Sequence, residues 1–111
     1  MVVDDLAAEE VDELFRALAD PTRRDILGRC VDGEPSVSRL ARAYPMSFAA
    51  VQKHVAVLER AGLITKRRNG REQLASGDVQ AVRSVSSMLV EFEQVWRGRI
   101  ARIDALIAQE E

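Results

Sequence analysis

The stretch SFAAVQKHVAVLERAGLI, residues 47–64, decides the fold of this chain. Ser47 is a favourable helix N-cap and Gly62 a favourable helix stop, so the stretch predicts a helix that ends near Ala61. Its aliphatic residues fall on one side at about 100° per residue, which predicts a core-facing surface. The other side carries small and polar residues where a solvated helix usually carries more charge. These residues are Ala49, Gln52, Lys53, Ala56, Glu59 and Arg60.

Two helices are predicted in the first third of the chain. Apolar residues at helical spacing predict one over residues 9–19. Asp20 as N-cap and Pro21 as the first helical residue predict the start of the next, which ends near Gly33. This second helix is expected to turn Ile26, Leu27 and Val31 inward.

A short third helix completes a DNA-binding pattern. Ser36 predicts its N-cap, and Pro45 ends it because the residue before a proline is disfavoured in helical geometry. A short helix, a tight turn and a second helix with an under-filled outer face form the helix-turn-helix pattern, whose second helix lies in the major groove of DNA. From this helix we expect DNA contacts by Ser47, Phe48, Ala49, Gln52 and Lys53.

The chemistry of these residues suits a DNA groove. Gln52 offers the paired donor and acceptor that can read adenine, and Lys53 can reach a phosphate or a guanine. The helix N-terminus at Ser47 favours a phosphate, and small residues let the backbone approach closely. Phe48 has two interpretations that the sequence leaves open: contact with a thymine methyl group, or packing on Tyr44.

A basic hairpin is predicted directly after this helix. In LITKRRNGREQLAS, Asn69-Gly70 predicts a two-residue turn between alternating strands. In the resulting register Arg68 faces Arg71, and Arg67 faces Glu72.

The two faces of this hairpin have different expected roles. The inward face packs on the body and closes with an ion pair between Arg67 and Glu72. On the outward face, Lys66, Arg68 and Arg71 are expected to contact the DNA backbone, although a solvated tip with diverging charges is an alternative interpretation. The outward face presents Lys66, Arg68, Arg71 and Gln73.

The charge of the chain is unevenly distributed. A formal net charge of -2 argues against a uniformly basic nucleic-acid binder. Residues 1–20 carry a net charge of -6 and residues 74–111 carry -2, whereas residues 21–46 carry +2 and residues 47–73 carry +4. Because a local patch matters more to an anionic partner than the total charge does, the segment 47–73 supports DNA binding.

The last segment predicts a dimerisation helix. From residue 78 to residue 108, apolar residues recur at steps of three and four, which predicts one long helix with an apolar stripe. A domain this small cannot cover such a stripe with its own helices, so a second copy is expected to pack on it. Folding of its first half onto the N-terminal helices is the alternative. The expected dimer contacts are Leu89, Phe92, Trp96, Ile100 and Ile103.

These elements predict a mainly α protein with a small β-hairpin: a winged helix-turn-helix with a long C-terminal dimerisation helix. Its 111 residues suffice for a single domain, residues 1–111, with residues 9–76 as the DNA-binding core and residues 78–108 as the dimerisation helix.

Three stretches carry a family resemblance. LFRALADPTRRDILGRC, SFAAVQKHVAVLERAGLI and RRNGREQ, in this order and spacing, closely resemble the ArsR family of bacterial winged-helix repressors. The resemblance implies a homodimer that binds double-stranded operator DNA and represses by blocking the promoter. It also leaves room for an inducer, which the sequence does not identify.

The resemblance does not include the metal-sensing motif of the family's founding members, a Cys-x-Cys pair in the third helix. Ser36 and Ser38 stand there in EPSVSRLA, and hydroxyls are poor ligands for soft metals. Cys30 and His54 are too few for a tetrahedral site, so we predict no metal site and no cofactor. We interpret Cys30 as a small buried hydrophobe instead of a redox switch. His54 is interpreted as partly buried and hydrogen-bonded instead of a base reader.

Other function classes receive less support. The sequence has no Cys/His pair, phosphate-binding loop or carboxylate cluster with a plausible base, so no enzyme is predicted. No apolar run approaches membrane-spanning length, and a single cysteine favours a reducing, cytoplasmic location. The main rival hypothesis is a winged-helix protein-binding module that uses its basic face for an acidic partner.

Overall fold

The helix starts predicted at Asp20, Ser36 and Ser47 are all present in the computed structural model, which describes residues 7–110. Each side chain accepts a hydrogen bond from the backbone amide three residues on, at 2.9 Å for Asp20 and 3.1 Å for the two serines. These bonds satisfy amide groups that have no partner inside the helix. Residues 1–6 and 111, the ends of the predicted domain, lie outside the described residues.

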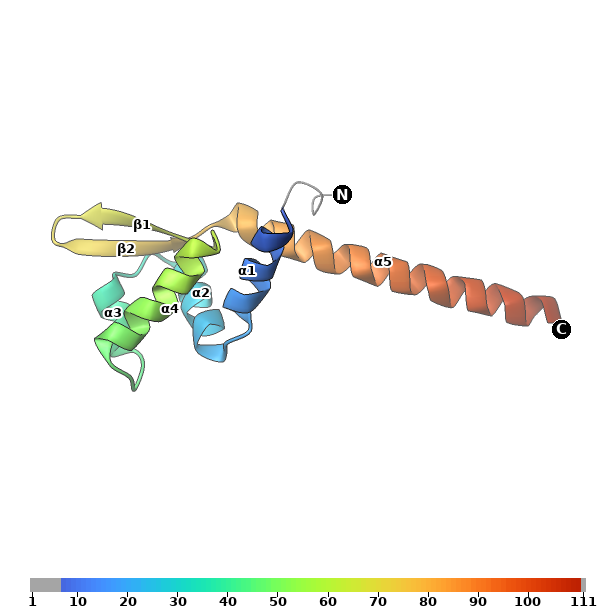
Figure 1. Ribbon diagram of the computed structural model, residues 1–111, viewed down its shortest axis with the longest axis horizontal. Helices are drawn as coiled ribbons and strands as arrows, with labels where there is room; N and C mark the ends of the chain where they lie inside the picture. Colours follow the sequence, from blue (N-terminus) through green and yellow to red (C-terminus); the bar gives the residue numbers. More distant parts are fainter. Residues whose placement is uncertain (1–6, 111) are drawn as a thin grey trace.

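The elements follow the predicted order of helices, hairpin and long helix (Figure 1). In Figure 1, α1 to α4 lie together, the hairpin extends from one side of them, and α5 projects away on the other side. The prediction of a mainly α fold with a small β-hairpin and a long C-terminal helix is confirmed. The elements are α1 (Ala8–Leu18), α2 (Pro21–Asp32), α3 (Val37–Arg42), α4 (Phe48–Arg60), β1 (Ile64–Asn69), β2 (Glu72–Gly77) and α5 (Val79–Glu110).

The core lies where α2, α3, α4 and the base of the hairpin meet. Val51, Val55 and Leu58, from the aliphatic side of α4, are at most 1% exposed. Burial of each such side chain contributes roughly 1.5–3 kcal/mol relative to leaving it exposed. The other large side chains that are fully buried in this core are Ile26, Leu40, Leu63 and Ile64.

One core prediction in α2 is wrong. Ile26 and Leu27 are buried as expected, but Val31 is 52% exposed. The last turn of α2 lies against the backbone of Gly77 at the end of β2, where an added β-carbon would be 2.6 Å from Val31 Cγ2. Gly77 has no side chain that could cover Val31. One side of Val31 therefore contacts the hairpin backbone, and the other side is exposed to solvent.

The hairpin pairs in a register that differs from the predicted one. Arg68 faces Gln73, not Arg71. The turn consists of Gly70 and Arg71 instead of Asn69 and Gly70, and Gly70 has a φ of 64° at the position where a type II′ turn needs glycine. The slip of two residues keeps the same side chains together on each face, so alternation could not distinguish the two registers. The predicted direction of the faces is wrong at the base of the hairpin. Ile64 and Ala75, on the face of Lys66, are buried, whereas Arg67 and Glu72 are exposed.

The predicted ion pair between Arg67 and Glu72 is also wrong. Arg67 binds Glu34 instead, with its Nε and Nη2 at 3.1 and 3.0 Å from Oε1. The loop that holds Glu34 also pairs with β2, because the carbonyl of Pro35 accepts the amide of Ala75 at 2.8 Å. The hairpin is therefore positioned by the loop before α3, which a local turn signal does not include.

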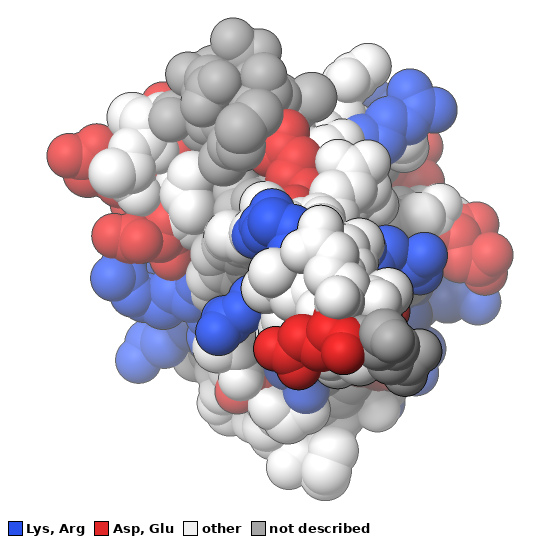
Figure 2. All heavy atoms as spheres, turned by 90° about the vertical axis from the view of Figure 1, so that its right-hand side faces the viewer, with Lys and Arg blue, Asp and Glu red and all other residues white. Residues whose placement is uncertain are grey.

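Helix α5 begins on the body and continues beyond it. Asp78 accepts the amide of Gln80 at 2.9 Å, and Val85 and Met88 are buried. From residue 89 to residue 110 no side chain is buried. Figure 2 views this side of the molecule, where uncharged side chains lie exposed between acidic and basic ones. The first part of the helix thus folds back on the body, and the rest leaves its apolar stripe in solvent.

The composition of α5 differs from that of a membrane span. It has 32 residues, but neither this helix nor another within residues 7–110 has the apolar character that crossing a membrane requires.

We expect Gly77→Ala to destabilise the protein by about 1–3 kcal/mol, because its β-carbon would overlap Val31 in a packed contact. Gly28→Ala is the matched control, since Gly28 lies in α2 with no neighbouring atom within 4 Å of an added β-carbon. Alanine is the better helix former, so the control should stabilise the protein by up to about 1 kcal/mol. Chemical denaturation measures both changes, and equal effects would contradict the close contact.

Candidate nucleic-acid interface

α4 turns its polar side to solvent because its aliphatic side is fixed in the core. Rotating the helix to hide this polar side would bring three buried aliphatic side chains into water, at a cost of several kcal/mol. The residues of α4 and its N-cap that were predicted to contact DNA are all exposed: Ser47, Phe48, Ala49, Gln52 and Lys53.

A groove of about 220 Å³ lies between α4, the recognition helix of the helix-turn-helix pattern, and the hairpin. It brings four of the predicted DNA contacts together: Phe48, Gln52, Lys66 and Arg71. The other four lie outside the groove lining, exposed on the surface: Ser47, Ala49, Lys53 and Arg68.

The groove also contains side chains that the sequence prediction did not assign to DNA contact. Ser38 comes from α3, and Glu72 and Gln73 come from β2. A signal for Gln73 was present, since the hairpin pattern places it on the same face as Lys66. No local signal marks Ser38, because its position depends on how α3 packs against α4.

The cations of the hairpin are not equally available to an anion. Lys66 Nζ lies 3.3 Å from Oε1 of Glu59 on α4. Arg68 Nε donates to the carbonyl of Gly70 at 3.4 Å, and Arg71 stands in the turn. Arg68 and Arg71 are exposed and free to meet a phosphate, whereas Lys66 must first leave a carboxylate partner.

Acidic side chains gather on α1. This helix lies toward the α5 side of the body, away from the hairpin tip (Figure 1). The acids of α1 are therefore separated from the arginines of the hairpin. The exposed acids of α1 are Glu9, Glu10, Asp12 and Glu13.

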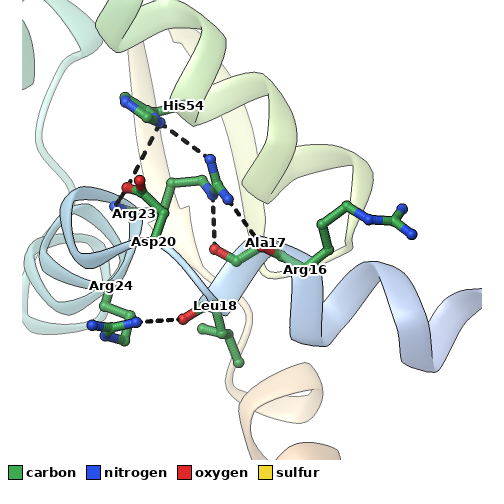
Figure 3. Close-up of polar contacts among 7 residues, drawn as sticks. All are labelled: Arg16, Ala17, Leu18, Asp20, Arg23, Arg24 and His54. Atoms are coloured by element: carbon green, nitrogen blue, oxygen red, sulfur yellow. Dashed lines mark hydrogen bonds and ion pairs between the residues drawn. The ribbon is translucent and has the colours of Figure 1, made fainter.

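His54 is partly buried and hydrogen-bonded, as predicted (Figure 3). Its Nδ1 lies 3.4 Å from Nη1 of Arg23 and 4.0 Å from Oδ2 of Asp20. Both partners belong to the start of α2, so the ring is directed into the protein and not toward the groove. This geometry supports a structural role for His54.

Phe48 and Tyr44 have separate surroundings. The Tyr44 hydroxyl donates to Asp25, and its ring lies 5.5 Å from Arg29 Cζ. Burial and the hydrogen bond to Asp25 raise the pKa of Tyr44 to about 12. Phe48 is 47% exposed and lines the groove. This position leaves part of the Phe48 ring open to an apolar contact.

Known proteins are similar to this chain in both sequence and fold. A helix-turn-helix domain family matches residues 18–67. The HTH-type transcriptional regulator Rv2034 of Mycobacterium tuberculosis is 31% identical over 99 residues, which cover 89% of this chain and 90% of that protein. An ArsR-like transcriptional regulator from Rhodococcus sp. RHA1 is 30% identical with a TM-score of 0.78, covering 88% of this chain and 92% of that one. The chain belongs to the ArsR family.

The assembly state is known for one further similar structure. It is the solution structure of a homodimeric winged helix-turn-helix DNA-binding domain from Mycobacterium bovis, a possible ArsR-family regulator. That chain is 26% identical with a TM-score of 0.64, and the match covers 77% of this chain and 81% of that one. The resemblance inferred from three sequence motifs, and the winged helix-turn-helix fold, are therefore confirmed.

The residues that replace the cysteine pair of the ArsR metal sensors have other contacts in this protein. Ser36 is the N-cap of α3 and Ser38 lines the groove. Within residues 7–110, His, Cys, Asp and Glu side chains do not gather in the groups of three that could hold a metal ion. Cys30 is 2% exposed, and burial raises the pKa of its thiol to about 11.

We expect Cys30 to react with a disulfide reagent at about pH 8 on the order of 100-fold more slowly than a free thiol. Burial blocks access, and the raised pKa keeps the thiol protonated until the pH approaches about 11. Absorbance of the released product measures the rate. The same protein in denaturant is the control and should react fast. Equally fast reaction of the native protein would contradict the core position of Cys30.

Proposed function

We propose that this ArsR-family protein is a homodimeric, sequence-specific DNA-binding regulator that represses transcription and does not respond to metal. The observation that carries the proposal is the groove in which Gln52 of α4 stands with Lys66 and Arg71 of the hairpin. The groove combines an amide that can read a base edge with cations that can hold the DNA backbone. In this proposal residues 9–76 are the DNA-binding core and residues 78–108 the dimerisation helix of one domain.

The two elements divide the contacts between them. α4 enters the major groove, with Gln52 nearest a base edge and Lys53 beside it. The helix N-terminus at Ser47 meets a phosphate. Arg68 and Arg71 hold phosphates or a narrow minor groove next to the site, because both are exposed and without a carboxylate partner among the described residues.

The second half of α5 supports the homodimer. An isolated helix is marginally stable in water, and a continuous exposed apolar surface marks an interaction site. The M. bovis relative with this fold is described as homodimeric. A second copy would also provide the second half-site contact that helix-turn-helix proteins use. The proposed interface residues, between 39% and 63% exposed, are Leu89, Phe92, Trp96, Ile100 and Ile103.

Repression follows from occupancy, since a dimer seated on an operator blocks access to the promoter, as the family resemblance implies. The absence of a metal response is proposed from the donor set. Ser36 and Ser38 provide hydroxyls where a soft metal needs thiolates, and Cys30 is buried with a raised pKa.

Gln52→Ala should weaken binding to the preferred operator by roughly 1–3 kcal/mol and affect random DNA much less, because a base-edge contact carries sequence information. Arg71→Ala should weaken binding to both DNAs by similar factors and make the salt dependence shallower by about one unit, because a phosphate contact releases a counterion. The operator comes from selection of bound sequences in a random DNA pool. Salt titrations on the operator and on a random duplex then measure both effects.

Arg67→Ala is the matched control for Arg71→Ala. Arg67 lies in the same hairpin but is paired with Glu34, so its loss should leave the salt dependence unchanged. If Gln52→Ala leaves the ratio of operator to random-DNA affinity unchanged, α4 does not read bases. That result would support the alternative hypothesis of a protein-binding module. A selection that returns no preferred sequence would overturn the proposed function.

Trp96→Ala should weaken the dimer by about 2 kcal/mol or more, because large buried aromatic residues dominate the binding energy of interfaces. DNA binding should weaken with it, since two half-sites must be held together. Sedimentation at several concentrations measures the dimer, and the fluorescence of Trp96, the chain's single tryptophan, reports its burial. Val90→Ala, at an exposed position away from the apolar stripe, is the control. A stable wild-type monomer at micromolar concentration would end this proposal.

A further inference from the structure

Two arginines at the start of α2 reach back to the end of α1 (Figure 3). Arg23 donates from Nε to the carbonyl of Ala17 at 2.8 Å and from Nη2 to the carbonyl of Arg16 at 2.9 Å. Arg24 donates from Nη1 to the carbonyl of Leu18 at 2.7 Å. The last carbonyls of a helix have no partner within it and carry partial negative charge. The two guanidinium groups therefore cap α1.

Of these two arginines, Arg23 also reaches the recognition helix. Its Nη1 lies 3.4 Å from Nδ1 of His54, which directly follows Gln52 and Lys53 in α4. A guanidinium only donates, so this contact requires an unprotonated Nδ1 and places the proton of the neutral ring on Nε2. One rigid, planar side chain thus joins the end of α1 to the residue beside the proposed DNA contacts.

We propose that Arg23 is a positioning residue for operator recognition, which holds the recognition helix to the end of α1 through neutral His54. The aliphatic contacts of α4 keep it in the core but are non-directional. The contact between Arg23 and His54 is directional, so it limits the small rotations of α4 that the aliphatic packing still permits and that set where Gln52 points. This inference rests on the proposed function, because it assumes that Gln52 reads bases.

Protonation of His54 breaks this contact. A proton on Nδ1 turns the acceptor into a donor that faces the Arg23 guanidinium, a like charge at 3.4 Å. The carboxylate of Asp20, 4.0 Å from Nδ1, then becomes the better partner. The backbone amide of Arg23 donates to Asp20 and lowers the pKa of its carboxyl, which favours the ionised form of Asp20.

The charge balance at His54 is set by these two groups. α1 contributes the backbone carbonyls that Arg23 holds, and the side chain of Arg16 points away from the ring (Figure 3). Within residues 7–110, no ion pair joins His54 to α3 or to the hairpin. Among the described residues, Asp20 is therefore the anion that can pair with protonated His54 when the link to Arg23 weakens.

The decisive comparison is Arg23→Met against Arg24→Met. Both variants remove capping bonds from α1 and should lower thermal stability, but Arg24 does not contact His54. Arg23→Met should reduce the ratio of operator to random-DNA affinity roughly tenfold, the discrimination that one good base contact supplies. Arg24→Met should keep the ratio within about twofold of the wild type, since a distant site acts independently. Circular dichroism confirms that each variant is folded. Equal ratios for both variants would overturn the inference.

A second pair of variants tests the other partner and does not depend on the folding of Arg23→Met. His54→Asn places an amide oxygen near the position of Nδ1 and cannot gain a charge, whereas His54→Leu removes the acceptor. His54→Asn should keep the specificity ratio, and His54→Leu should lose roughly as much of it as Arg23→Met. The opposite order, or equal ratios for the two variants, would overturn the inference.

The pH dependence separates positioning from simple charge. As the pH is lowered, wild-type specificity should fall in step with the protonation of His54 followed by NMR, and that of His54→Asn should stay constant. A histidine that only adds positive charge near DNA would strengthen binding to both duplexes and leave the ratio unchanged, which would contradict the inference.

His54 is the chain's single histidine, so its ring nitrogens are assigned directly by NMR. A neutral ring with its proton on Nδ1 would also contradict it. Should the wild type show no preferred sequence, the proposed function fails first, and this inference with it.

Discussion

Burial of the aliphatic side of α4 is the contact on which the rest of the molecule depends. Val51, Val55 and Leu58 are enclosed by α2, α3 and the base of the hairpin, so the helix cannot rotate without exposing them. The same packing places Leu63 and Ile64 in the core directly after the helix, which fixes where the hairpin leaves the body. The groove between helix and hairpin, and the exposure of Gln52 within it, both follow from this one constraint.

The described part of the molecule consists of a packed body and an end of α5 that packs on nothing within the chain. Within residues 7–110, the buried side chains lie at or before Met88, whereas the rest of α5 carries exposed apolar side chains. A helix in that condition gains most of its stability from packing against a partner. In the proposed homodimer, ordering of the second half of α5 and association of two chains are therefore coupled.

The sequence predicted features that are controlled locally. Helix starts at Asp20, Ser36 and Ser47 were predictable because a side-chain oxygen and a nearby amide decide them. In the hairpin, the side chains that share a face were predictable because side chains alternate along a strand, but the face that turns inward was not. Its register was not, since a shift of two residues preserves both faces and the choice depends on the loop at Pro35. The partner of Arg67 was missed for the same reason, because Glu34 lies far from it in the sequence.

In the candidate site too, the sequence predicted only features that neighbouring residues control. Gln52 and Phe48 were found from helical spacing, whereas Ser38 enters the groove through packing between helices that no spacing reveals. The inward direction of His54 followed from its angle on the helix. Its contact with Arg23 could not be read from the sequence, because 31 residues separate them.

The separation of charge along the molecule has a consequence for how it meets DNA. Acids on α1 and exposed arginines at the hairpin place opposite charges on opposite sides of the helical body, which forms a local electric dipole although the net charge of the chain is negative. In the field of a polyanion such a dipole turns its basic end forward before any surfaces touch. Approach through α1 is repelled, so the first encounters favour orientations that bring the hairpin and the proposed recognition helix toward the DNA. This pre-orientation weakens as added ions shorten the range of the field.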